Sequence, residues 1–114
     1  MTIRRDDVQP FDFDGIAIRD YTADGRLSSS FAEILVPPGA THARAWSQRS
    51  DKYYYVVRGR LWFEVDGESH DLEAGDVCIV PQGARFAYAN RSDRDGLIIL
   101  VHTPSFDLEQ EVFE

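Results

Sequence analysis

The chain has 114 residues, of which 43% are hydrophobic and 12% aromatic, so it can fill one core and is not expected to be disordered. Its formal net charge of −8 repels phosphate backbones, which argues against a nucleic-acid partner. A single cysteine, Cys78, excludes an internal disulfide, and no apolar run reaches the length of a secretion signal or a membrane span. We therefore expect a cytoplasmic protein with no membrane contact.

Short runs of β-branched and aromatic residues follow one another along the chain, separated by turn residues, and no helix of convincing length is predicted. The expected strands are Ile16–Thr22, Ser29–Val36, His42–Gln48, Tyr53–Arg58, Leu61–Asp66, Ser69–Leu72, Val77–Val80, Ala84–Asn90 and Leu97–Thr103. Asp66-Gly67 lies between two of these runs and predicts a hairpin, because glycine tolerates the positive φ of such turns. Many short strands at this spacing predict an all-β sandwich or closed barrel.

The chain reads as one domain over residues 1–114, with the barrel at about 11–104. Residues 1–10 are expected to form a loose arm or an extra strand. Residues 105–114 form an acidic tail that either crosses one mouth of the barrel or is a solvated end. If the tail crosses the mouth, Asp107 and Glu109 could reach back over it.

A pattern of turn residues in the second half of the chain identifies a family. The spacing G-x5-P-x-G-x6-N begins at Gly75 and runs through Pro81, Gly83 and Asn90, and an earlier motif ends at Gly59. These residues resemble the two motifs of the cupin superfamily, in particular its small single-domain members. The resemblance implies an all-β, cupin-type double-stranded β-helix, or jelly-roll, barrel.

At the positions where cupins carry their metal ligands, this chain has side chains that do not suit a metal ion. Counted back from Gly59, the family carboxylate falls on Lys52 and the two histidines of the first motif fall on Gln48 and Trp46. The histidine of the second motif falls on Phe86. Tryptophan and phenylalanine have no lone pair for a metal, and a lysine cation repels one. The sequence therefore predicts no metal at the usual place and no other cofactor.

Side chains two residues apart on a strand share a face, which predicts the lining of the barrel. The expected lining residues are Trp46, Gln48, Lys52, Tyr54, Phe86 and Tyr88. Aromatic walls with a few polar groups are typical of a small-molecule site.

Four of the candidate residues could take part in catalysis. His42 begins the strand that contains Trp46, on the same face, and histidine is the usual proton carrier near neutral pH. Lys52 could pair with a carboxylate or phosphate of a substrate, act as an acid or base once burial lowers its pKa, or extend to the rim of the barrel. Tyr54 and Tyr88 could hydrogen-bond a ligand, donate a proton, or simply pack.

The remaining candidates would bind the substrate without reacting. They are Trp46, Gln48, Phe86, His102 and Glu33. His102 lies near the end of the last strand, and the sequence leaves its facing open. Glu33 interrupts an apolar strand, so it is either a carboxylate in the pocket or an outward-facing residue.

The favoured hypothesis is a metal-independent enzyme that acts on a sugar, a nucleoside or a related carbonyl compound. Its chemistry would be proton abstraction beside a carbonyl, followed by elimination (lyase or dehydratase) or reprotonation (isomerase or epimerase). A non-catalytic binding or sensor protein is the first alternative. A metal enzyme with rerouted ligands, for which His42, His102 and Glu33 are the candidates, is the second.

The resemblance also implies a quaternary structure. Small cupins often form homodimers through their outer sheet surfaces, and Tyr53, Tyr55 and Trp62 are the aromatic residues expected on such a surface. We therefore expect a homodimer that binds a small-molecule ligand.

Overall fold

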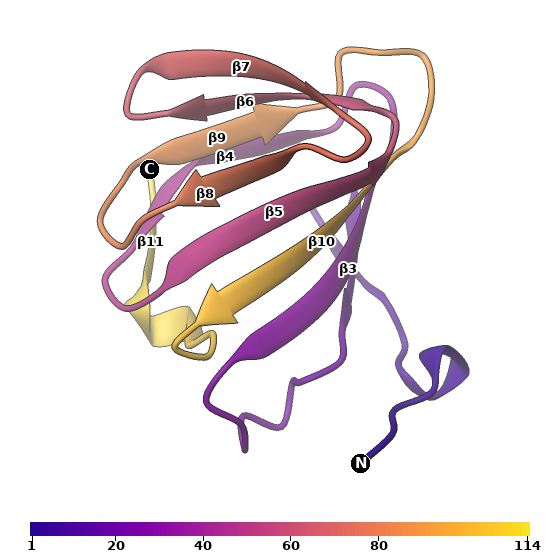
Figure 1. Cartoon of the computed structure of the whole chain (residues 1–114), viewed down its shortest axis with the longest axis vertical. Helices are drawn as coiled ribbons and strands as arrows, with labels where there is room; N and C mark the ends of the chain where they lie inside the picture. Colours follow the sequence, from indigo (N-terminus) through magenta and orange to yellow (C-terminus); the bar gives the residue numbers. More distant parts are fainter.

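The computed structural model describes residues 1–114, which form two antiparallel sheets facing each other (Figure 1). The first sheet has the order β1-β2-β3-β10-β5-β8, with strands Phe11–Phe13, Ile16–Asp20, Ser30–Val36, Gly96–Thr103, Asp51–Arg58 and Val77–Val80. The second has the order β11-β4-β9-β6-β7, with strands Glu111–Phe113, Thr41–Ser47, Phe86–Ala89, Arg60–Val65 and Glu68–Glu73. Two short 3₁₀ helices, Arg5–Asp7 and Leu108–Gln110, complete the chain.

The nine strands expected from the sequence are all present, with ends that differ by at most two residues. The hairpin between β6 and β7 is confirmed, and Asp66 and Gly67 both have positive φ, 48° and 83°. The strands β1 and β11 were not predicted. Each has only three residues, which is too short for an alternating pattern to be recognised.

The core lies between the sheets and is built from alternate residues of each strand. On β3 the buried side chains are Ala32, Ile34 and Val36, while the residues between them are more exposed. Strand β10 alternates in the same way from Gly96 to His102. The all-β barrel predicted from the sequence is therefore confirmed, and each sheet turns one apolar face toward the core.

Strand β4 departs from this alternation. Its pairing with β9 matches His42 to Tyr88 and Ala45 to Phe86, so β4 carries one extra residue between the two pairs. Such a bulge turns the following side chains to the opposite face. Ala45 and Ser47 consequently point into the barrel and are buried, whereas Trp46 points outward.

Two motif residues have clear structural roles. Gly59 has φ 86°, and a Cβ there would lie 2.6 Å from the carbonyl oxygen of Asp95, so a side chain would clash with the backbone. The buried Asn90 side chain donates to the carbonyl oxygens of Val36 and Arg94, at 2.8 and 2.7 Å. These residues fix the loops at one end of the barrel.

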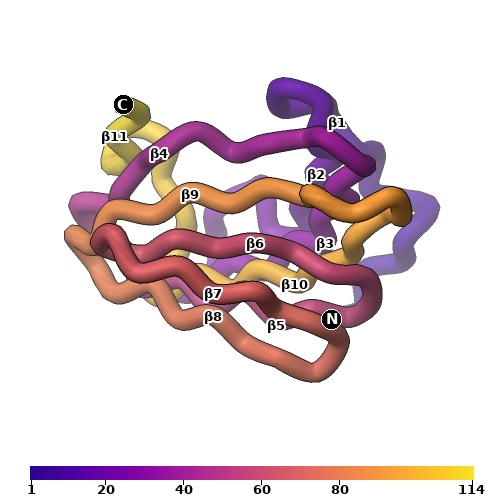
Figure 2. Tube along the Cα trace, turned by 90° about the horizontal axis from the view of Figure 1, so that it is seen from above, coloured from indigo at the N-terminus to yellow at the C-terminus, as the bar shows by residue number.

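The short strands near the two chain ends, β1 and β11, approach each other at the barrel. Strand β11 pairs with the edge strand β4 of the second sheet, and β1 extends the first sheet (Figure 2). The rings of Phe13 in β1 and Phe113 in β11 are 5.8 Å apart. No helix in the structure has the length and apolar character needed to cross a membrane.

Candidate active site

A cavity of about 260 Å³ lies between the two sheets, and residues near both chain ends form part of its lining. Its lining is mostly apolar and comprises Phe11, Phe13, Ile18, Ile34, His42, Ala45, Lys52, Tyr54, Phe86, Tyr88, Leu100, His102, Phe106, Leu108, Glu111 and Phe113. An apolar cavity with a few polar groups is the usual make-up of a small-molecule site.

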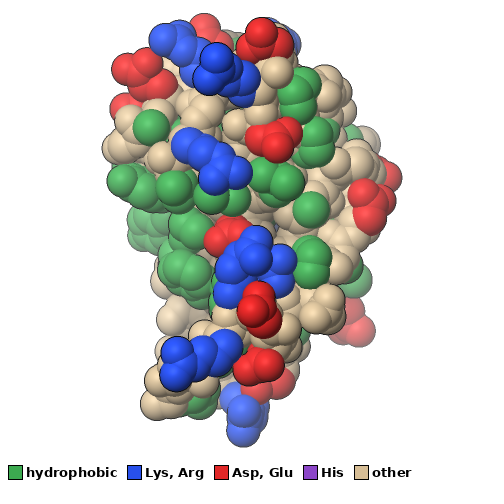
Figure 3. All heavy atoms as spheres, turned by 90° about the vertical axis from the view of Figure 1, so that its right-hand side faces the viewer, with side chains coloured by type: hydrophobic (Ala, Val, Ile, Leu, Met, Phe, Trp, Pro, Cys, Tyr) green, Lys and Arg blue, Asp and Glu red, His purple; other side chains and the backbone are tan.

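Six of the residues singled out from the sequence line this cavity. They are His42 on β4, Lys52 and Tyr54 on β5, Phe86 and Tyr88 on β9, and His102 on β10. The open question about His102 is settled, because its side chain is buried and faces inward. No histidine is visible on the outer face drawn in Figure 3, where exposed hydrophobic side chains lie between charged ones.

The prediction that Trp46 and Gln48 line the cavity is wrong. The bulge in β4 turns both outward, so the rule that side chains two residues apart share a face no longer holds after His42. The Trp46 ring instead lies under the guanidinium of Arg85, 5.5 Å from its centre. Gln48 is exposed, and its carbonyl oxygen accepts a hydrogen bond from the side chain of Gln82 at 2.6 Å.

Glu33 is also outside the cavity. It lies on β3 between the inward-facing Ala32 and Ile34, so it points to the outer surface, where it forms an ion pair with Arg5 at 3.7 Å. Its assignment as a substrate-binding residue is therefore wrong. The rerouted set of His42, His102 and Glu33 is not assembled, because only the two histidines reach the cavity.

The family's metal positions do not fit a metal ion in this chain. With the four-residue spacing that the first cupin motif also allows, its two histidine positions fall on the inward-facing Ala45 and Ser47. Alanine has no donor atom, and the Ser47 hydroxyl oxygen accepts hydrogen bonds from backbone N–H groups, including that of Ser50 at 2.9 Å. The other two positions hold the Lys52 cation and Phe86, and neither can coordinate a metal.

His42 is held between aromatic rings, with the ring centre of Phe13 at 5.4 Å and that of Tyr88 at 5.0 Å. Its Nδ1 lies 2.7 Å from the carbonyl oxygen of Ala43. Since a carbonyl can only accept, the proton is on Nδ1 and the lone pair is on Nε2. Burial lowers the pKa of His42, so the imidazole is neutral near pH 7. His42 Nε2 has no hydrogen-bond partner in the protein and is available as a base.

Tyr54 and Tyr88 are almost completely buried, with exposed fractions of 2% and 1%. Neither hydroxyl makes a hydrogen bond to the protein, and no buried side-chain polar atom in the structure lacks a partner, so both oxygens lie at the surface of the cavity. Burial raises the pKa of both phenols well above their ordinary value, so both stay protonated. They are therefore neutral hydrogen-bond donors that face the cavity without a partner.

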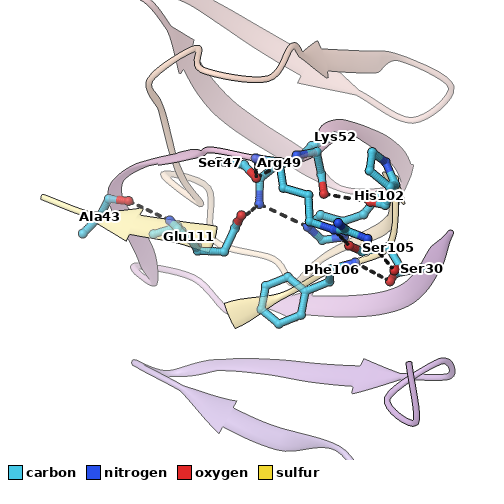
Figure 4. Close-up of polar contacts among 12 residues, drawn as sticks. Ser30, Ala43, Ser47, Arg49, Lys52, His102, Ser105, Phe106 and Glu111 are labelled. Carbon is cyan, nitrogen blue, oxygen red and sulfur yellow. Dashed lines mark hydrogen bonds and ion pairs between the residues drawn. The ribbon is translucent and has the colours of Figure 1, made fainter. Parts of the chain in front are cut away.

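A second polar group in the cavity consists of Lys52, Glu111 and His102, with Lys52 hydrogen-bonded to the other two. Lys52 Nζ donates to Glu111 Oε1 and lies 3.1 Å from His102 Nε2, as Figure 4 shows with Glu111 reaching in from β11. Burial lowers the pKa of Lys52, and the Glu111 carboxylate opposes this by favouring the ammonium form. Burial and the Lys52 charge lower the pKa of His102 to about 3, so His102 is neutral and accepts the hydrogen bond.

The sequence did not point to Glu111. It drew attention to Asp107 and Glu109 in the same tail, but both are exposed, and Asp107 accepts a hydrogen bond from the backbone N–H of Glu109 at 3.1 Å. In the structure Glu111 and Phe113 both lie on the inward face of β11, a strand too short for its alternation to be recognised in the sequence.

A family model for the cupin domain matches residues 32–102. The chain therefore belongs to the cupin family, as its motifs and its two-sheet barrel indicated. Among curated relatives, the tetracenomycin polyketide synthase protein TcmJ of Streptomyces glaucescens is 29% identical over 80 residues, which is 70% of this chain and 54% of TcmJ. The polyketide synthase CurC of Streptomyces cyaneus is 26% identical over 80 residues. The chain thus spans about half the length of these two curated relatives.

Solved structures with the same fold cover the whole chain. Pac13, described as a nucleoside dehydratase, is 23% identical, with a TM-score of 0.86 over 100% of this chain and 90% of its own. A histidine variant of the Streptomyces protein has been solved with uridine, with a TM-score of 0.85 over 99% of this chain and 89% of its own. A predicted oxalate decarboxylase from Thermotoga maritima is 19% identical, with a TM-score of 0.82 over 91% of this chain and 99% of its own. At these identities the likeness establishes the fold.

Proposed function

We propose that this protein is a metal-independent dehydratase that eliminates water from a nucleoside or related sugar bearing a carbonyl group. One observation supports this proposal above the others. The cavity is lined by residues with three polar atoms that make no hydrogen bond to the protein: Nε2 of His42 and the hydroxyl oxygens of Tyr54 and Tyr88. A neutral base beside two neutral donors is suited to proton transfer at a carbon next to a carbonyl.

The required substrate chemistry follows from the strength of the base. A neutral imidazole cannot remove a proton from an ordinary sugar C–H bond, but it can remove one next to a carbonyl, where the resulting negative charge moves to oxygen. The tyrosine hydroxyls would donate hydrogen bonds to that oxygen as the charge develops. In a nucleoside oxidised to an aldehyde at carbon 5′, the proton on carbon 4′ is acidic in this way and the 3′-hydroxyl can leave.

The elimination then balances without any added reagent. His42 Nε2 takes the proton from carbon 4′, and the C–H electron pair forms an enolate. As the double bond forms between carbons 3′ and 4′, the C3′–O bond breaks, and the oxygen leaves with the proton carried by the imidazolium. The products are water and an α,β-unsaturated aldehyde, and His42 is neutral again.

The class of substrate is supported by the cavity and by the comparisons. Aromatic side chains, including Phe13, Phe86 and Phe113, provide flat apolar surfaces for a base or sugar ring. The cavity volume of about 260 Å³ suits a small ligand. Pac13 is described as a nucleoside dehydratase, and its variants have been solved with uridine.

The test is incubation of the purified protein with uridine 5′-aldehyde, with mass spectrometry to detect loss of one water. We expect conversion at the same rate before and after EDTA treatment, since no metal takes part. Incorporation of deuterium from D₂O without loss of water would instead identify an isomerase. Tight binding with the aldehyde recovered unchanged would overturn the dehydratase assignment in favour of a binding protein, and loss of activity in EDTA would overturn metal independence.

A further inference from the structure

Only two of the sixteen residues that line the cavity are a lysine, arginine, aspartate or glutamate, namely Lys52 and Glu111. Both side chains are almost fully buried, with exposed fractions of 4% and 5%. They form an ion pair, and the remaining hydrogen-bonding capacity of the ammonium is used in part by His102 Nε2. The cavity is consequently lined by charges that cancel.

The two partners are anchored very differently. Lys52 lies on β5, which is paired on both sides within the first sheet, by β10 and β8. Glu111 lies on the three-residue strand β11, which pairs only with β4 at the edge of the second sheet. Glu111 is therefore a carboxylate that the C-terminal segment delivers to a cation fixed in the barrel (Figure 4).

A buried ammonium without a partner is strongly unfavourable and attracts any available anion. If Glu111 were absent, a carboxylate or phosphate of a ligand would be the natural partner of Lys52. With Glu111 in place, an anionic ligand must either displace this carboxylate or bind beside it, and like charges at short range in a buried site repel strongly. An uncharged ligand meets neither penalty.

We infer that Glu111 is a specificity-determining residue that makes the cavity select uncharged ligands over anionic ones of the same shape. This inference rests on the proposed function only for the choice of ligand. Within that function, Glu111 admits the nucleoside aldehyde and excludes the corresponding acid. The neutral His42 and tyrosines do not discriminate in this way, because they carry no charge at neutral pH.

The test compares two ligands of nearly the same shape, uridine 5′-carboxamide and uridine 5′-carboxylate, by isothermal titration calorimetry. Wild-type protein should bind the carboxamide at least about tenfold more tightly. Glu111→Gln should reverse the preference, because the ammonium is then left to the ligand. Glu109→Gln removes an exposed carboxylate from the same segment and is the matched control, in which the wild-type ratio should persist.

Several results would overturn the inference. One is a wild-type protein that binds the carboxylate as tightly as the carboxamide, and another is a folded Glu111→Gln variant with the wild-type ratio. If Glu111→Gln does not fold, Lys52→Gln measured at pH 9 tests the same point, because the higher pH keeps the unpaired carboxylate ionised, Glu111 is then the sole charge and the preference for the carboxamide must increase. An unchanged ratio in Lys52→Gln would also contradict the inference.

Failure of the proposed function gives a different result. A wild-type protein that binds neither uridine derivative contradicts the nucleoside assignment. The role of Glu111 is then tested with a simpler pair of ligands. Acetate and acetamide, followed by NMR chemical-shift changes in wild-type protein and Glu111→Gln, then measure the same preference. Equal acetate binding by both proteins would overturn the role of Glu111 itself.

Discussion

Lys52 Nζ lies 3.1 Å from Nε2 of His102, with both side chains buried in the wall of the same cavity. The ammonium can only donate, so Nε2 must carry its lone pair and His102 must be neutral. Protonation of His102 would place a second cation against Lys52. The contact therefore links the stability of the fold to the protonation of one imidazole.

The first prediction concerns this link. In the unfolded chain the pKa of His102 is about 6.5, whereas in the fold it is about 3. Between these pH values the unfolded chain binds a proton that the folded chain does not, so the free energy of unfolding falls as pH falls. Each such proton contributes about 1.4 kcal/mol per pH unit. His42, whose pKa is also lowered by burial, acts in the same direction.

Urea unfolding of wild-type protein and His102→Gln at pH 7 and pH 5 measures this contribution. The glutamine can accept a hydrogen bond from Lys52 but does not titrate. Between these pH values wild-type protein should lose about 2 kcal/mol more than the variant. Equal losses in the two proteins would mean that His102 is not held neutral in the fold.

The second prediction concerns the stability of the Lys52–Glu111 pair. Glu111→Leu leaves a buried ammonium without its carboxylate and should lower the free energy of unfolding by about 3–5 kcal/mol. Lys52→Met combined with Glu111→Leu removes both charges and should recover most of that loss. Thermal and urea unfolding of the single and double variants give the values. A double variant no more stable than Glu111→Leu would show that packing, not charge, accounts for the loss.

The third prediction concerns His42 as the base. His42→Gln should reduce the turnover number for elimination by about 10²–10⁴-fold, the usual contribution of a general acid–base group. Binding of uridine should change much less, because the ring is not the only contact in the cavity. The control is His70→Gln, since His70 lies half-exposed on β7, away from the cavity. Turnover by His42→Gln at the wild-type rate would exclude this mechanism.

The fourth prediction uses the unpaired tyrosine hydroxyls. Tyr54→Phe and Tyr88→Phe remove cavity hydroxyls that make no hydrogen bond to the protein, so the thermal midpoint should stay the same or rise slightly. Ligand affinity or turnover should fall by about tenfold for each, the value of one neutral hydrogen bond. Tyr53→Phe, on the opposite face of β5, is the control for both measurements. A large loss of stability without loss of binding would assign these hydroxyls a structural role.

The fifth prediction concerns association. The outer face of the first sheet exposes hydrophobic side chains on neighbouring strands, including Tyr55 on β5 and Val77 and Ile79 on β8. We expect a homodimer through this face. Trp62, which the sequence also suggested, lies instead on the second sheet, with the guanidinium of Arg91 3.9 Å from its ring centre.

Light scattering at micromolar concentration tests the association. The Ile79→Lys variant should be monomeric, while Leu27→Lys, at an exposed hydrophobic residue in the loop before β3, should remain dimeric. A monomeric wild-type protein would contradict the prediction.

The barrel could be predicted from the sequence because inward-facing and outward-facing residues alternate along its strands. Its turns also contain residues that adopt a positive φ, such as Gly59 and Asp66-Gly67. The same alternation placed Lys52, Tyr54, Phe86 and Tyr88 in one cavity. It failed for the second half of β4, because a bulge changes the facing of side chains without leaving a distinct local pattern.

Glu111 could not be predicted for a different reason. Its partner Lys52 is 59 residues earlier in the chain, and the contact forms only because a three-residue strand attaches to a sheet edge. A periodicity of side chains says nothing about which distant edge such a strand will join. The pairing that balances charge in the cavity is thus a tertiary property.

The contribution of both chain ends to the cavity lining has an evolutionary consequence. Phe11 and Phe13 precede the segment that matches the cupin family model, and Phe106, Leu108, Glu111 and Phe113 follow it. Mutations in these two short ends can change the walls and charge of the cavity while the barrel between them keeps the residues that fold it. Ligand preference can therefore diverge between relatives at positions that a comparison of their shared barrels would not include.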